Sequence, residues 1–136
     1  MITALDTNVL IDFFGADPTF GHLSNQALRR CVGEGGLVAC DVVWAEVAAW
    51  FPSPSRAAEA MDRLGVRFGP VDVPSALSAG SEWKAYRRHG GARERMIADF
   101  LIGAHALAHA DRLLSRDRGF YRTYFKKLQV LDPTKD

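Results

Sequence analysis

Short apolar runs alternate with amphipathic stretches along this chain, and this alternation predicts strands that alternate with helices. The apolar runs that have the length of buried strands are residues 2–5, 37–40, 66–73, 112–115 and 128–131, and Gly69-Pro70 leaves the end of the third run open. The segments between them predict helices over residues 9–14, 20–33, 42–51, 55–64, 74–89, 96–110 and 120–125. This order of elements favours a parallel α/β sheet with right-handed crossovers.

Residues at the element boundaries sharpen the prediction. Thr7 or Asn8 can cap the first helix, and Gly15 ends it. Asp41 is a plausible N-cap for the helix over 42–51. The helix over 96–110 is apolar around nearly its whole circumference, which predicts that it is buried against the sheet.

Length and composition fit one folded domain over residues 1–136. The 136 residues are enough for a real core, and 48% hydrophobic with 24% charged residues is ordinary for a soluble globular protein. No apolar run reaches the roughly 18 residues of a membrane span, and the N-terminus lacks the features of a signal peptide. We therefore expect a cytoplasmic protein without a membrane partner. Cys31 and Cys40 match no metal-binding spacing, and we expect them to be reduced.

The net charge of +1 conceals an asymmetry between the two halves of the chain. Residues 1–68 hold 5 Lys/Arg and 8 Asp/Glu, whereas residues 69–136 hold 12 and 8. The basic excess is concentrated between Lys84 and Lys127, which suits a polyanionic partner. A solvated helix face is the simpler reading of the same residues.

Four carboxylates lie inside or beside apolar segments that are far apart in the sequence: Asp6, Glu46, Asp99 and Asp117. An ionised carboxylate in apolar surroundings costs several kcal/mol unless it is paired or bound to a cation. One shared partner would satisfy all four, and the simplest candidate is a hard divalent metal ion, which prefers oxygen ligands.

The predicted topology brings these four residues to one edge of the sheet. Asp6 and Asp117 follow strands, Glu46 lies early in a helix that follows a strand, and Asp99 lies near the start of the buried helix. In an open parallel sheet, ligands bind beyond the carboxyl ends of the strands. Each residue also has an ordinary reading on its own. For Asp6 it is an N-cap, for Glu46 an exposed helix position, for Asp99 a pairing with Arg95, and for Asp117 a turn.

Other candidate sites are weaker. His105 and His109 have a spacing that can bind zinc, but no third ligand is evident nearby. Trp44, Trp50 and Phe51 could stack on bases, although core packing explains them equally well. The sequence contains no phosphate-binding glycine loop.

The stretches LDTNVLIDFF, VVWAEV, IADFLIGAHAL and LLSRDRGFYRTYF resemble the PIN-domain family, and in particular the VapC-type toxins of bacterial toxin–antitoxin pairs. The resemblance covers about residues 2–131. It implies an α/β/α sandwich with a central five-stranded parallel sheet. It also implies an endoribonuclease that depends on Mg²⁺ or Mn²⁺, a cognate antitoxin as partner, and a homodimer.

The resemblance carries functional roles onto matching residues. Asp6, Glu46, Asp99 and Asp117 match the acidic quartet of the family, and Asn8 and Ser115 match the polar positions that support it. A metal-activated water would then hydrolyse an RNA phosphodiester bond. By charge and proximity alone, further candidates for phosphate contacts are Arg93, Arg95, Arg116 and Arg118.

Two other functions remain open from the sequence. The first is a non-catalytic RNA- or protein-binding module with the same fold. The second is a metal-dependent phosphatase with Asp6 as nucleophile, but such enzymes usually need a second Asp two residues later, where this chain has Asn8. The sequence does not identify the RNA target, the cut site, the number of metal ions or the antitoxin.

Overall fold

The computed structural model describes residues 1–91 and 95–136 of the 136-residue chain. Its sheet has five strands, all parallel, in the order β3-β2-β1-β4-β5. The strands are β1 Ile2–Leu5, β2 Gly36–Cys40, β3 Val66–Gly69, β4 Arg112–Leu114 and β5 Val130–Leu131. The predicted parallel sheet is therefore confirmed.

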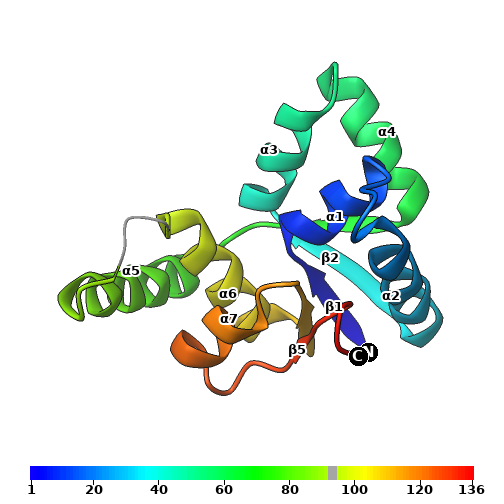
Figure 1. Ribbon diagram of the computed structural model, residues 1–136. Helices are drawn as coiled ribbons and strands as arrows, with labels where there is room; N and C mark the ends of the chain where they lie inside the picture. Colours follow the sequence, from blue (N-terminus) through cyan, green and yellow to red (C-terminus); the bar gives the residue numbers. More distant parts are fainter. Residues whose placement is uncertain (92–94) are drawn as a thin grey trace.

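Helices flank both faces of this sheet. Those in the described residues are α1 Thr7–Phe14, α2 Gly21–Glu34, α3 Asp41–Trp50, α4 Pro54–Leu64, α5 Val73–Arg88, α6 Ile97–His109 and α7 Arg118–Tyr124. In Figure 1, α1 and α2 lie on one side of the sheet, and α6 and α7 lie on the other. The α/β/α layering expected from the sequence is confirmed. Helix α3 contacts both α1 and α6, so it stands over the end of the sheet from which these helices begin.

The order of the strands places a switch point at the centre of the sheet. From β1 the chain moves to β2 and β3 on one side, and then returns through α5 and α6 to β4 on the other side of β1. The backbone N–H of Asp6 donates to the carbonyl of Leu114 at 3.0 Å, so the carboxyl ends of β1 and β4 are held together. Such a switch point is where open α/β sheets bind ligands.

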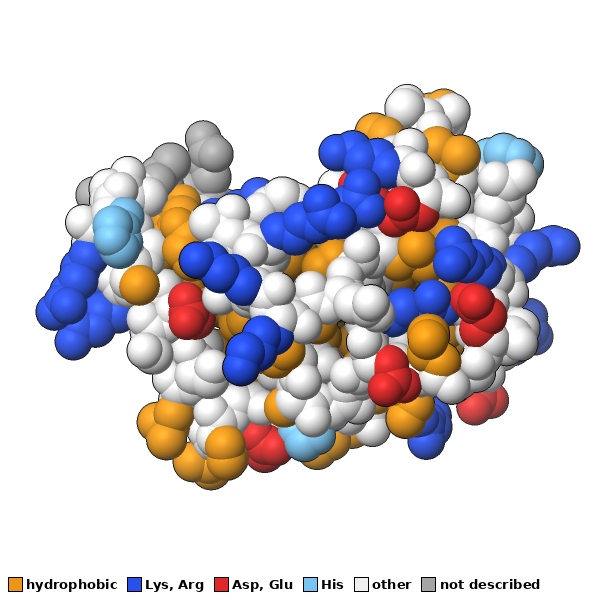
Figure 2. All heavy atoms as spheres, turned by 90° about the horizontal axis from the view of Figure 1, so that it is seen from below, with side chains coloured by type: hydrophobic (Ala, Val, Ile, Leu, Met, Phe, Trp, Pro, Cys, Tyr) orange, Lys and Arg blue, Asp and Glu red, His pale blue; other side chains and the backbone are white. Residues whose placement is uncertain are grey.

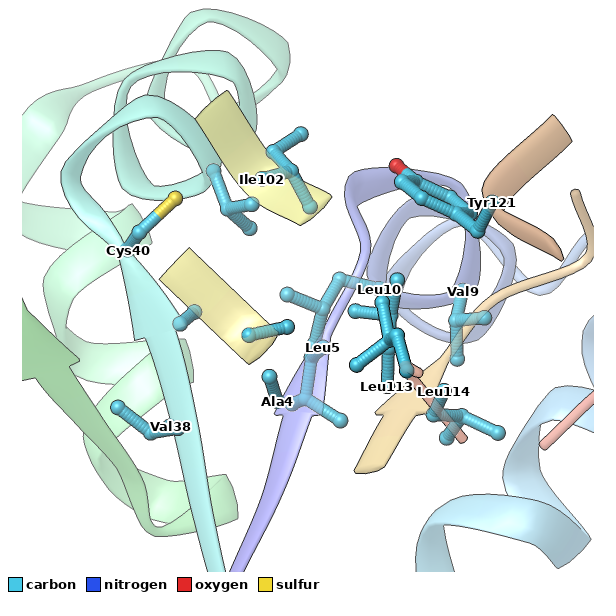
Figure 3. Packing of buried hydrophobic residues seen from close by; sticks show 14 of the residues in the cluster. Ala4, Leu5, Val9, Leu10, Val38, Cys40, Ile102, Leu113, Leu114 and Tyr121 are labelled. Carbon is cyan, nitrogen blue, oxygen red and sulfur yellow. The ribbon is translucent and has the colours of Figure 1, made fainter. Parts of the chain in front are cut away.

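A buried cluster fixes the elements on both sides of this point. Leu5 and Leu113 come from neighbouring strands, Val9 and Leu10 come from α1, and all four belong to the same core (Figure 3). Burying a side chain of this kind stabilises a fold by about 1.5–3 kcal/mol. Since Asp6 lies between Leu5 and the start of α1, its backbone is held in place by the core on both sides.

The third strand ends earlier than the sequence suggested. It stops at Gly69, because Pro70 has no backbone N–H with which to continue the ladder. Gly69 also allows a close approach, since a Cβ there would lie 2.8 Å from Nε2 of His105. His105 is buried against this strand, and among the described residues the partner of His109 is Asp72. These contacts favour packing and pairing roles over a zinc site for the two histidines.

Several predicted boundaries also differ. Asp6 is the N-cap of α1, as the ordinary reading of this residue suggested, because its side chain accepts a hydrogen bond from the Thr7 N–H. The prediction of Thr7 or Asn8 as the cap is wrong, since both lie inside the helix. Asp41 is the first residue of α3, not its N-cap. Both cysteines are buried and free, as expected. In the described ranges, no helix combines the length and apolar character needed to cross a membrane.

Candidate active site

Asp6 is the most buried carboxylate of the predicted quartet, with 6% of its surface exposed. Its Oδ1 accepts a hydrogen bond from the Thr7 N–H at 2.8 Å. Its Oδ2 accepts from the hydroxyl of Ser115 at 2.7 Å and from the hydroxyl of Tyr121 at 3.0 Å. The side-chain amide of Asn8 lies at 3.4 Å from the same oxygen. Donors from α1, from the end of β4 and from α7 therefore fix this carboxylate.

Burial raises the pKa of Asp6 to about 6, although its hydrogen bonds with Ser115, Tyr121 and Thr7 act in the opposite direction. The negative charge of Asp99 raises the pKa further. Desolvation outweighs hydrogen bonding here because the ionised form loses its water shell on burial. A cation would reverse this balance, since it favours the charged form.

Asp99 lies in the first turn of α6, where its carboxylate accepts a hydrogen bond from the Met96 N–H at 3.2 Å. Burial is the largest cause of its raised pKa, and the charge of Asp117 adds to the shift. Asp99 therefore interacts electrostatically with Asp6 on one side and with Asp117 on the other. The charges of these three carboxylates therefore influence one another, and we call the three residues the acidic edge.

Asp117 is engaged by an arginine. The Arg95 guanidinium donates to both oxygens of the Asp117 carboxylate, and the Nη2 to Oδ1 distance is 2.9 Å. The guanidinium carbon of Arg95 also lies 4.3 Å from the centre of the Phe120 ring. The hydrogen bond to Asp117 is the main cause of the raised pKa of Arg95. Arg95 thus forms its ion pair with Asp117, and not with Asp99 as one reading of the sequence suggested.

Glu46 reaches the acidic edge through Thr7. Its Oε1 accepts a hydrogen bond from the Thr7 hydroxyl at 2.7 Å, and Thr7 directly follows Asp6. Glu46 itself is exposed, at the middle of α3. It therefore borders the site from the helix that stands over the sheet.

The residues predicted to support the quartet lie between its members. Ser115 donates to Asp6 and accepts from the backbone N–H of Asp117 at 2.9 Å. Asn8 donates to Asp6 and Ser115, both at 3.4 Å, and accepts from the Arg116 N–H at 3.3 Å. Together they connect the ends of β1 and β4.

The other predicted arginines are occupied elsewhere. Arg116 donates to Asp12 at 2.6 Å and lies 4.0 Å from the centre of the Phe20 ring. Arg118 donates to Asp136 at 2.7 Å. Arg93 lies outside the described residues. The contacts of Arg116 and Arg118 therefore hold the segment after β4, and offer no free guanidinium at the acidic edge.

Reasoning from the sequence missed two residues of the site. Tyr121 is buried, and both burial and its contact with Asp6 raise its pKa well above the usual range. It lies one helical turn after Asp117, but Tyr124 on the same short helix has an equally plausible position. Thr7 was considered as a cap, whereas its hydroxyl serves Glu46.

The set of donors fits a hard cation in its chemistry, because all four side chains are carboxylates. The mutual repulsion of Asp6 and Asp99 is also what a bound cation would relieve. Their arrangement is not yet that of a closed metal site. Among the described residues, no three Asp, Glu, His or Cys side chains are grouped closely enough to hold an ion. The pairing of Asp117 with Arg95 and of Glu46 with Thr7 explains this geometry.

The base-stacking role considered for the aromatic residues on α3 finds no support. The Trp44 ring packs edge-on against Phe68 at 5.9 Å, and Phe51 packs against Phe14 at 5.2 Å and Trp50 at 5.2 Å. These rings contact one another, on the side of α3 next to β3 and α1.

Solved structures with similar folds include toxin–antitoxin complexes and a toxin. VapBC2 from Rickettsia felis, bound to a DNA fragment of its promoter, has a TM-score of 0.74 at 17% identity and covers 97% of this chain and 98% of that chain. VapBC-1 from nontypeable Haemophilus influenzae has a TM-score of 0.74 at 22% identity, with coverage of 99% and 100%. VapC20 from Mycobacterium tuberculosis, described as a sarcin–ricin loop cleaving toxin, has a TM-score of 0.58 at 17% identity, with coverage of 87% and 93%. At these identities the likeness establishes the fold.

No curated protein sequence matches this chain. The family comparison is decisive instead, because the sequence model of the PIN domain matches residues 3–126. This match includes every residue of the acidic edge. The chain belongs to the PIN-domain family.

Proposed function

We propose that this protein is a metal-dependent endoribonuclease and the toxin of a toxin–antitoxin pair. The observation that carries the proposal is the acidic edge, where Asp6, Asp99 and Asp117 interact at the switch point of a PIN-domain sheet. VapC20, which has the same fold, is described as a toxin that cleaves the sarcin–ricin loop. A structural neighbour from Rickettsia felis is a toxin–antitoxin complex.

In this proposal Asp6, Glu46, Asp99 and Asp117 hold one or two Mg²⁺ or Mn²⁺ ions. When bound, the ion supplies a water of lowered pKa and stabilises negative charge on the phosphate. Asp6 is kept in position by Ser115, Tyr121 and Asn8. Its carboxylate is therefore already ordered before a ligand binds. In this proposal Arg95, whose guanidinium donates to both oxygens of the Asp117 carboxylate, is displaced when Asp117 binds an ion.

When Asp117 separates from Arg95, the guanidinium of Arg95 becomes free to contact the substrate. A guanidinium freed beside the acidic edge can donate two hydrogen bonds to a phosphate. Among the arginines predicted to contact phosphate and described in the structure, Arg95 is the one whose partner belongs to the site itself. We propose it as the phosphate contact, with Arg116 and Arg118 in supporting structural roles.

The remaining parts of the proposal follow from the toxin role. Its substrate is cellular RNA, its site of action is the cytoplasm, its inhibitor is a cognate antitoxin, and the active form is a homodimer. The phosphatase alternative is not favoured. The residue two positions after Asp6 is Asn8, whose amide donates to the Asp6 carboxylate and supplies no acid.

The test is RNA cleavage by purified protein. Asp6→Asn and Asp99→Asn each remove one carboxylate charge, and Asp62→Asn, an exposed position on α4, is the matched control. Cleavage that requires Mg²⁺ or Mn²⁺, is lost in both site variants and survives in the control supports the proposal. Cleavage that persists in excess EDTA, or in Asp6→Asn with native circular dichroism, contradicts it.

Growth arrest distinguishes the non-catalytic alternative. Expression of the chain without an antitoxin should stop growth, and expression of Asp99→Asn should not. A binding module would keep its effect when one carboxylate is replaced by an amide, because the fold and the surface are unchanged.

A further inference from the structure

A basic pocket lies away from the acidic edge, beside β5 and the start of β4. Its volume is about 810 Å³, within the usual range of ligand pockets. Four cationic side chains line it, and they come from three elements and one loop: Arg30, Arg112, Arg122 and Lys126. Figure 2 looks from below at the side of the molecule where both termini lie, and Lys and Arg side chains gather across this face.

Part of the charge in the pocket is neutralised within the protein. Glu34 accepts from Arg112 at 2.7 Å and from Arg30 at 3.2 Å, so one carboxylate serves two arginines. Asp136 also lines the pocket and is paired with Arg118. Counting Arg118 with the four lining cations gives five positive side chains, and Glu34 and Asp136 offset two of them, so three positive charges remain.

The unneutralised charge resides mainly on Arg122 and Lys126. Both are exposed. No salt bridge or side-chain hydrogen bond within the described residues fixes either cation, although the charge of Arg122 also helps to hold the pKa of Asp136 below its usual range. Arg112, by contrast, is a fixed part of the wall. Its side chain is only 8% exposed, and its Nε donates to the Thr3 hydroxyl at 3.0 Å. The pocket therefore combines a rigid basic wall with two free cations at its rim.

The composition of the lining indicates which partner fits. None of the described residues that line it is aromatic, so the lining offers no aromatic platform on which bases could stack. Cations without such a platform contact the phosphate backbone and carry no sequence information. A strand of nucleic acid held by its phosphates matches these properties.

Helix α7 connects the pocket to the acidic edge. It begins directly after Asp117, and Arg122 and Lys126 lie in its last turn and just beyond. A helix of its seven residues is roughly 10 Å long. The two ends of this helix are therefore separated by a distance that a few nucleotides of single strand can span.

We propose that this pocket binds the phosphate backbone of the RNA substrate at a distance from the cut site. The inference rests on the proposed ribonuclease function and adds a second anchoring site to it. Binding there is independent of sequence and of metal, because it depends on Arg122 and Lys126 and not on the carboxylates.

The experiment measures binding and not cleavage. A labelled single-stranded RNA of mixed sequence and about 20 nucleotides, longer than the site of a typical single-strand-binding domain, is titrated with full-length protein in EDTA at several salt concentrations. The variant Arg122→Gln/Lys126→Gln is compared with Lys84→Gln/Arg88→Gln, which removes two exposed charges from α5. Circular dichroism checks that both variants are folded.

We expect the pocket variant to lose about tenfold in affinity, and the slope of log K against log salt to become shallower by about 1.4, for two lost phosphate contacts. The α5 control should retain the wild-type affinity within about twofold. An unchanged affinity and slope in the pocket variant overturn the inference. Polyglutamate is titrated in parallel, and a loss of affinity in the pocket variant for polyglutamate but not for RNA also overturns the inference, because it would assign the pocket to an acidic protein segment.

The two proposals can fail separately. If wild-type protein binds this RNA but never cleaves RNA with metal, the ribonuclease function fails and the pocket remains a backbone site. If cleavage is normal and the pocket variant binds and cleaves like wild type, only the pocket is refuted.

Discussion

Arg95 donates two hydrogen bonds to the Asp117 carboxylate while its guanidinium packs on the ring of Phe120. The acidic edge therefore contains its own counter-charge. Any cation that uses Asp117 has to compete with this pair. Because the side chains of Arg95 and Asp117 are 28% and 34% exposed, solvent weakens the pair, and displacement by a divalent ion is feasible.

Replacing Arg95 with Ala should strengthen metal binding. Removal of the competing guanidinium frees both oxygens of Asp117, and we expect Mn²⁺ to bind about fivefold more tightly, which corresponds to about 1 kcal/mol for a partly exposed pair. The Mn²⁺ affinity of Arg95→Lys should lie between those of wild type and Arg95→Ala, since an ammonium cannot form the bidentate contact. Isothermal titration with Mn²⁺ measures this, with Arg63→Ala as control. A weaker affinity in Arg95→Ala would mean that the arginine organises the site instead of competing for it.

The raised pKa of Asp6 predicts how the stability of metal-free protein depends on pH. The folded state holds this proton up to a pH of about 6, whereas the unfolded chain releases it near 3.8. Stability is therefore lost as the pH rises between these values, by up to about 3 kcal/mol, and changes little above them. Urea unfolding of wild type and Asp6→Asn from pH 4 to pH 7.5 isolates this contribution as a difference.

In that experiment the stability of wild type relative to Asp6→Asn should fall toward pH 6 and then level off. The comparison is needed because Asp99 also has a raised pKa, and His105 has a lowered one through burial. A constant difference across the range would show that Asp6 is ionised in the folded protein throughout.

Tyr121→Phe should alter the titration of Asp6 and leave the packing intact. The variant removes one donor to the buried carboxylate, so the ionised form becomes less favourable and the pKa of Asp6 should rise further. We expect stability at pH 7.5 to fall by about 1 kcal/mol, and the acidic limb of the cleavage rate to move to higher pH. Tyr124→Phe on the same helix is the control, and a matching shift in it would refute the assignment.

Thr7→Val tests the position of Glu46. Valine has the shape of threonine but cannot donate to the Glu46 carboxylate, so the side chain of this exposed glutamate becomes free to move. We expect a decrease in kcat of about tenfold, the cost of a misplaced ligand contact, whereas Thr7→Ser retains the wild-type rate. Single-turnover cleavage at saturating metal measures both. Equal rates in the two variants would exclude a role for this contact.

Arg116→Gln separates structure from substrate binding. Asp12 is 5% exposed at its side chain, and without Arg116 it keeps only Ser24 as a side-chain partner among the described residues. Leaving a buried carboxylate without its cation should cost about 3 kcal/mol of stability. The double variant Asp12→Asn/Arg116→Gln should recover much of this loss in urea unfolding. If Arg116→Gln is as stable as wild type but binds RNA more weakly, the result contradicts the structural role and supports the phosphate contact suggested by the sequence.

The sequence was sufficient to predict the sheet and the edge at which the carboxylates gather. Asp6 and Asp117 follow directly after apolar runs, and the carboxyl ends of parallel strands must share an edge. The position of Asp99 in the first turn of a buried helix was equally readable. These inferences depend only on the order of elements, which the hydrophobic pattern determines.

The hydrogen-bond and ion-pair partners of those carboxylates could not be predicted from the sequence. Whether Arg95 pairs with Asp99, one turn away, or with Asp117 depends on tertiary contacts such as that of its guanidinium with the Phe120 ring. Tyr121 and Tyr124 were equivalent in the sequence until the direction of α7 separated them. Gly69–Pro70 ended β3 early because a missing N–H outweighs the apolar pattern that follows.

The crowding of donors around one oxygen has a consequence for proton exchange. Oδ2 of Asp6 faces hydrogens from Ser115, Tyr121 and Asn8, so a proton can settle there only after a hydroxyl turns away. Ser115 has a single hydrogen to redirect, and its oxygen simultaneously accepts the Asp117 N–H. Protonation of Asp6 at this oxygen would thus reorient the hydroxyl of Ser115 or Tyr121, and a turn of the Ser115 hydroxyl would also affect its contact with the Asp117 N–H.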